Sequence, residues 1–295
     1  MTDETTAKER VGFSPRRVWV IALNTFIESV RQKVFYILIV FALVVIACAL
    51  FFRQFDFGEE FKFVKDFCLG AISVFGTCIA IVGTSMLLPN EVEHRTIYTI
   101  LSKPVRRLEF LLGKFVGSVQ LLLTSTILMS MMFVVVLFVM MVASEGRVRE
   151  EAAQTKEESA QVELQHQMVQ IRADTLDPDI VKGVLLIFVK LCMLAGITLL
   201  ISTFSTSMVF NVIVATMIFI IGHLIGPVKD AWSHVPVINW VLAIPPDLGA
   251  FNVADDIVLG NVIPWEHVGS VALYGVVYTV AVVAAAHFSF EGREI

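Results

Sequence analysis

The sequence predicts an all-α membrane protein that crosses the bilayer six times. Of its 295 residues, 57% are hydrophobic and 17% are charged, against about 25% charged residues in typical globular proteins. The apolar residues gather into runs that are near or above the roughly 18 residues needed to span a hydrocarbon core. Several apolar runs of this length are typical of membrane-spanning helices and not of a soluble domain, so we expect a polytopic membrane protein.

The expected transmembrane domain covers residues 34–290, preceded by a tail and an interfacial helix at 1–33 and followed by a short tail at 291–295. The third span is longer than a bilayer needs, which indicates that it tilts or projects from the membrane. An even number of spans places both termini on the same side. By their hydropathy, the six spans are expected at about residues 34–52, 67–88, 113–143, 181–204, 208–226 and 267–290.

An amphipathic helix is expected before the first span. Ser14 and Pro15 form a helix-start signal, because serine caps a helix and proline fits its first turn. From Arg16 to Lys33, apolar and polar residues alternate at helical spacing, with positive residues at both ends. Two interpretations stay open: an interfacial helix along the membrane surface, and a simple extension of the first span.

The polar segment 90–114, between the second and third expected spans, carries the most informative pattern. Glu91 and Glu93 suit the positive end of a helix dipole, and Glu91 can pair with Arg95 at i,i+4 spacing. Pro104 stops the helix, since the residue before a proline is pushed out of helical geometry. We expect a stiff amphipathic helix at the membrane surface, followed by a basic turn. Such an element could receive force from a soluble partner.

The run from Glu91 to Lys114 reads EVEHRTIYTILSKPVRRLEFLLGK. It resembles the first cytoplasmic loop of ABC-2-type permeases, the membrane subunits of ATP-binding-cassette exporters. The resemblance extends to RVWVIALNTFIESVRQKVFY near the N-terminus and to IPPDLGAFNVADDIVLGNVIP near the C-terminus, so it covers most of the chain. The chain also resembles the subgroup that includes the permease of the nitrous-oxide-reductase copper-maturation system.

The resemblance implies a permease subunit, in the manner of an exporter, that moves substrate or transmits force across the bacterial plasma membrane. It implies a homodimer and a separate cytoplasmic ATPase, which would hold the ATP and magnesium. The count of Lys and Arg barely favours one orientation, and the resemblance places both termini in the cytoplasm. By the same resemblance, a coupling helix contacts the ATPase through Glu91, Glu93, Arg95, Ile97, Tyr98, Lys103, Arg106 and Arg107.

This orientation makes two other segments external. Residues 145–179 are strongly hydrophilic with few loop breakers, which is typical of a helical excursion; a short coiled coil and a solvated helical hairpin both stay open. Residues 227–266 contain five prolines and three tryptophans, a composition that favours short helices on the outer membrane surface. Either segment could gate the path or dock a periplasmic or extracellular partner.

The chain carries no enzyme motif, because the phosphate-binding G-x-x-x-x-G-K-[ST], H-E-x-x-H and G-x-S-x-G patterns are all missing from the sequence. We therefore expect no catalytic residues and no cofactor in this chain, and ATP must be bound by another one. The six histidines are scattered singly. The methionines of the third span do not share one narrow helical face, so no metal site is expected. Lipid is an expected partner, and nucleic acid is not.

Lys190 is the one clearly intramembrane charge in the expected spans. An ionisable residue at such depth is a functional hypothesis by default. The alternative is that its side chain reaches the outer interface along the helix. Two other functions stay open: a secondary transporter driven by an ion gradient, which the lack of an Asp or Glu well inside a span disfavours, and a non-transporting membrane anchor for partner proteins.

Overall fold

The computed structural model describes residues 13–52, 60–87, 89, 106–154, 158–175, 177–232 and 245–291. Within these ranges the chain forms helices and short 3-10 turns and no strand, which confirms the predicted all-α fold. The helices are α1 (Pro15–Arg31), α2 (Lys33–Cys48), α3 (Glu60–Ser85), α6 (Arg107–Gln154), α7 (Glu158–Thr175), α8 (Asp179–Phe204), α9 (Met208–Trp232), α11 (Ala254–Leu259) and α12 (Trp265–Glu291), with 3-10 turns η1 (Ala49–Phe52) and η2 (Gly249–Phe251).

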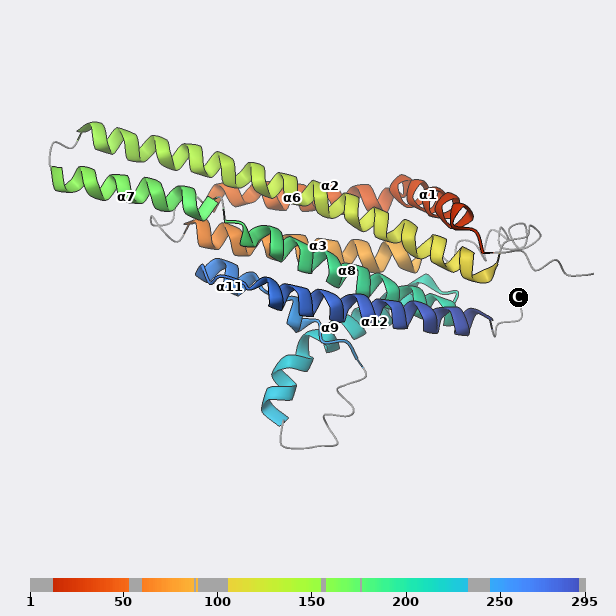
Figure 1. The fold of residues 1–295 in the computed structure, drawn as a ribbon. Coiled ribbons are helices and arrows are strands. Elements are labelled where there is room, and N and C mark those ends of the chain that lie inside the picture. The colour runs from red at the N-terminus through yellow and green to blue at the C-terminus, as the bar shows by residue number, and fades with distance from the viewer. Residues whose placement is uncertain are drawn as a thin grey trace, which may run out of the picture.

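Six of these helices are long and apolar enough to cross a membrane, and they are the six predicted spans. Five of them, α2, α3, α6, α8 and α12, run alongside one another (Figure 1). α8 is the central helix, since it contacts α3, α6, α9 and α12 and is buried over most of its length. α1 and the C-terminal end of α12 lie at one end of the bundle, and α7 and α11 lie at the other (Figure 1).

α3 begins at Glu60, seven residues before its predicted start. The cause is that two charges in its first turns have partners that are remote in the sequence. Glu60 binds Arg147 of α6 at 3.3 Å, and Lys65 binds Asp177, just before α8, at 3.3 Å. Charged residues lower the mean hydropathy, so the sequence predicted that the span begins after them. Their ion pairs offset much of the free-energy cost of burying them.

α6 is a continuous helix of 48 residues, or roughly 72 Å at 1.5 Å per residue. A bilayer with its head groups is about 40–45 Å thick, so α6 projects well beyond it. α7 runs back along the projecting part (Figure 1). Arg172 of α7 donates to Glu145 of α6 at 2.7 Å, and Val148 is fully buried. The segment predicted as a helical excursion therefore forms a helical hairpin, which was one of the open alternatives.

α1 is a helix of its own rather than an extension of the first span. Gln32 takes an extended backbone conformation, with ψ 130°, and separates α1 from α2. α1 lies so close to α6 that a Cβ added at Gly117 would come within 2.8 Å of the carbonyl oxygen of Ala22. Glycines allow this approach between helices. The other side of α1 exposes apolar side chains such as Trp19 and Ile27, as expected for a helix at a membrane surface.

We predict that Gly117→Ala weakens the contact between α1 and α6. The added methyl group would meet backbone atoms, and overpacking of this kind costs roughly 1–3 kcal/mol. Gly146→Ala is the matched control in the same helix, because nothing lies within 4 Å of its added Cβ, and losing a helical glycine stabilises by about 0.5–1 kcal/mol. Thermal unfolding of the purified chain in detergent should show a lower midpoint for the first variant only. Equal midpoints would contradict the close packing of α1 on α6.

Candidate functional site

The coupling loop predicted at 90–114 is described only from residue 106 onward. Arg106 and Arg107, both predicted as ATPase contacts, are described at the start of α6. The site is therefore built from the start of α6 and from α1 and α12, which pack beside it. The remaining predicted contact residues lie outside the described residues: Glu91, Glu93, Arg95, Ile97, Tyr98 and Lys103.

Glu109 joins the first residues of α1 and α6. Its side chain is fully buried. Oε1 accepts a hydrogen bond from the backbone N–H of Ser14 at 2.7 Å, and Oε2 accepts from Nη1 of Arg17 at 3.1 Å and from the N–H of Arg106 at 3.2 Å. These charge-assisted bonds offset the burial of the carboxylate. We call Ser14, Arg17, Arg106 and Glu109 the Glu109 joint.

Arg107 connects the start of α6 to the end of α12. Its Nη1 donates to the carbonyl oxygen of Phe290 at 3.1 Å, and its guanidinium lies 6.0 Å from the centre of the Phe290 ring. Phe110 stacks on the same ring at 6.2 Å. The last carbonyls of a helix have no partner within the helix, so a basic side chain is well placed there. Arg107, which the sequence predicted as a contact of the ATPase, thus binds Phe290 of its own chain.

Lys114 extends the contact between α6 and α1. Its side chain is almost fully buried, and its Nζ lies 3.7 Å from Oε2 of Glu28 on α1 and 5.8 Å from the centre of the Phe110 ring. Together with the Glu109 joint, this pair fixes α1 to α6 at two places along α1.

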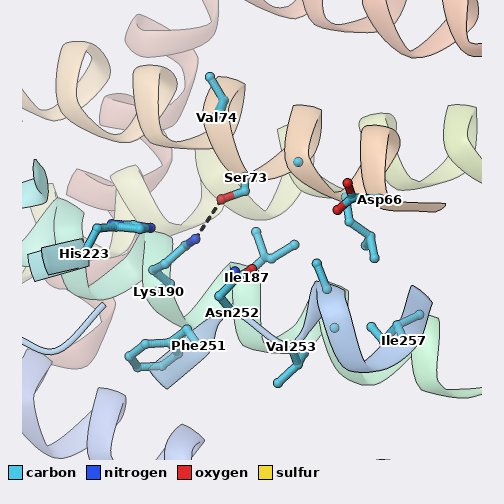
Figure 2. A pocket seen from close by; sticks show the side chains of 14 residues that line it. Asp66, Ser73, Val74, Ile187, Lys190, His223, Phe251, Asn252, Val253 and Ile257 are labelled. Carbon is cyan, nitrogen blue, oxygen red and sulfur yellow. Dashed lines mark hydrogen bonds between the residues drawn. The ribbon is translucent and has the colours of Figure 1, made fainter. Parts of the chain in front are cut away.

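A second polar site lies further along the bundle, in a pocket between α3, α8, α9 and the segment 251–257 (Figure 2). The pocket has a volume of about 210 Å³. Lys190 is 2% exposed, and its Nζ donates to Oγ of Ser73 at 2.7 Å (Figure 2). Lys190 lies about three helical turns into α8, roughly 16 Å from its first residue. The ammonium group is held in the pocket by its bond to Ser73.

The segment 247–257, which forms one wall of this pocket, turns into the bundle. It was expected on the outer membrane surface with the rest of 227–266. η2 and α11 are the short helices predicted there, but Leu248, Phe251 and Ile257 are fully buried. Glycines in three neighbouring helices leave room for them: a Cβ at Gly222, Gly275 or Gly183 would lie within 3 Å of these side chains. α9 also continues through Pro227 to Trp232 instead of ending at 226.

The six spans and the charges buried between them define a multi-pass membrane protein, in which the polar groups described above connect helices or line a pocket. In the part of the chain that is described, no group of three or more His, Cys, Asp or Glu side chains could hold a metal ion. The chain matches the family described as ABC-2 family transporter protein over residues 52–284 and belongs to it. No curated protein matches the chain.

Membership of this family confirms the resemblance of the loop to ABC-2-type permeases. The family is a membrane transport component and is not itself catalytic. It implies an ATP-binding-cassette partner and, typically, a dimeric assembly. The sequence pattern contained Glu109 but did not single it out, because its partner Ser14 lies 95 positions away in the chain.

We predict that the Glu109 joint stabilises the fold as well as the position of the loop. Glu109→Ala removes the buried carboxylate that accepts hydrogen bonds from Arg17 and from two backbone N–H groups, which should cost roughly 3 kcal/mol. Glu266→Ala is the matched control, because Glu266 also lies in the first turn of a span but is exposed; its loss should cost no more than about 1 kcal/mol. Thermal unfolding in detergent measures both. Similar losses in the two variants would contradict the joint.

Proposed function

We propose that this chain is the permease subunit of an ATP-binding-cassette exporter, driven by a separate cytoplasmic ATPase. The observation that supports this most is the Glu109 joint. It ties the first residues of α1 and α6 to a single buried carboxylate, directly after the loop that the sequence predicts as the coupling helix. In this proposal, motion of that loop is transmitted to α1 and α6 together, because Glu109 connects the starts of the two helices.

The proposed assembly contains two copies of this chain and two copies of the ATPase. In it, Glu91–Lys103 contacts the ATPase, and both termini face the cytoplasm of a bacterium. The α6–α7 hairpin then projects on the opposite side of the plasma membrane, where it could meet an external partner. In this proposal Arg106 and Arg107 have different roles. Arg106 binds Glu109 just before α6, and Arg107, the first residue of α6, carries the motion to α12 through Phe290.

The chain also resembles the permease of the copper-maturation system, which makes copper a candidate substrate. The positions of the methionines in α6 argue against a copper site. Thioether ligands must converge on one Cu(I) ion. Met129 and Met140 are buried in the bundle core, whereas Met131 is 62% exposed on another side of the helix. These side chains fill the core or face lipid, as methionine commonly does.

An ion-gradient transporter is the second candidate, and one observation favours it. α3 begins at Glu60, so Asp66 lies within this helix, about two turns from its start, and not before it as the predicted span had it. Intramembrane acids are typical of such transporters. Association with an ATPase separates the two candidates, and so the first experiment tests it.

We predict that Ile97→Pro abolishes association with the ATPase. Proline within a helix costs roughly 3 kcal/mol or more, and the expected coupling helix would lose its shape. The chain is purified from its native membrane and the associated ATP-binding-cassette protein and ATP turnover are measured. Gln161→Pro, in α7, is the control and should retain both. Normal association and turnover in inserted Ile97→Pro protein would show that the loop does not couple.

We predict that the α6–α7 hairpin lies on the external side of the plasma membrane. In a chain without its native cysteines, Val169→Cys should react with a membrane-impermeant thiol reagent in intact spheroplasts, because Val169 is 67% exposed on α7. Phe13 lies just before α1, and its side chain is 50% exposed. Phe13→Cys should react only after the membrane is opened. The reverse pattern would invert the proposed orientation.

A further inference from the structure

Lys190 differs from the other buried lysines of the described chain. Lys65, Lys114 and Lys182 are equally inaccessible, and each has a carboxylate within 4 Å: Asp177 at 3.3 Å, Glu28 at 3.7 Å and Asp179 at 2.5 Å. In the described residues, Lys190 has the hydroxyl of Ser73 and no carboxylate. Burial of an ammonium group between spans without a counter-charge is unfavourable. Lys190 therefore lacks the adjacent carboxylate that the other buried lysines have.

The groups around Lys190 form a site that could supply this negative group from a ligand. An ammonium group has three N–H donors, and Ser73 takes one of them. The Ser73 hydroxyl, the Asn252 amide and the His223 ring line the same end of the pocket (Figure 2). The Ser73 hydroxyl and the Asn252 amide can each donate a hydrogen bond to a carboxylate or phosphate oxygen. Positive charge and donors are thus gathered at one end.

The rest of the pocket limits the size and charge of such a ligand. A cavity of about 150 Å³ holds a benzene molecule, and this pocket measures about 210 Å³. Leu69, Ile187 and Val253 give it apolar walls. Asp66 lies two helical turns from Ser73, roughly 10 Å away along α3, at the opposite end of the pocket (Figure 2). Its carboxylate disfavours a second negative group there.

We propose that this pocket binds a small anion with one acidic group, a carboxylate or a phosphate, and an apolar remainder. The acidic group pairs with the Lys190 ammonium, and the apolar part lies between α3 and α8. A soluble acid and the phosphate of a lipid head group share this chemistry. The site lies within one copy of the chain, so binding needs no ATPase. A negative result with Ile97→Pro would therefore leave this binding site untouched, and a negative binding result would leave the proposed ATPase partner untouched.

The test is calorimetric titration of the purified chain in neutral detergent with benzoate, and with benzyl alcohol as the uncharged ligand of the same size. Benzoate should bind, and benzyl alcohol should bind at least tenfold more weakly. Lys190→Met should weaken benzoate binding by roughly tenfold or more, as expected for a hydrogen bond to a charged group. Lys190→Arg should retain part of the affinity. Lys229→Met, which removes a half-exposed lysine of α9 outside the pocket, should bind as the unaltered chain does.

Asp66→Asn gives a second variant that keeps Lys190. Removing a like charge about 10 Å away should tighten benzoate binding on the order of threefold. Binding that persists in Lys190→Met, or no benzoate binding by the unaltered chain in either detergent or phosphatidylcholine nanodiscs, would overturn the proposal. Nanodiscs also identify the source of the anion. Competition by added phosphatidylglycerol assigns the site to a lipid phosphate, and the absence of competition assigns it to a soluble acid.

Discussion

The structure depends on a carboxylate that is shielded from water at the start of its longest helix. Glu109 is fully buried, and an ion in that position must have all its bonds supplied by the protein. The donors come from Ser14, Arg17 and Arg106, so this one side chain joins the starts of α1 and α6. The close contact of Gly117 with Ala22 then fixes the two helices along their length. Local electrostatics and backbone packing give the same arrangement, which is the consistency expected of a well-specified fold.

Charge pairing plays a similar part at the other end of the bundle. Lys182 binds Asp179 and the carbonyl oxygen of Ile263, and Asp179 accepts the N–H of Ile263. Glu60 binds Arg147, so the base of the α6–α7 hairpin is tied to α3. The spans are thus connected by polar contacts near both ends and by apolar packing between them. Lys190 is the exception among the buried lysines described, and this exception is what makes its pocket a candidate binding site.

The sequence alone predicted the fold class and all six spans, because hydropathy over about 18 residues is a local property. It did not predict what depends on distant partners. The early start of α3 follows from the pairing of Glu60 with Arg147, and the burial of Phe251 follows from a glycine in α12. Of the candidate site, Lys190 could be identified from its depth, whereas Ser73, His223 and Asn252 become its neighbours only in the folded chain. The predicted contacts from Glu91 to Lys103 lie outside the described residues and stay predictions.

The length of α6 has a mechanical consequence. Because its first turns are fixed to α1 and α12 and its far end is braced by α7, it can act as a lever arm. A tilt of about 5° at its base would move the far end by roughly 6 Å, given a helix of 48 residues at 1.5 Å per residue. A small tilt at one end of α6 would thus become a large displacement at its other end. The amplification comes from geometry alone and requires no joint within the bilayer.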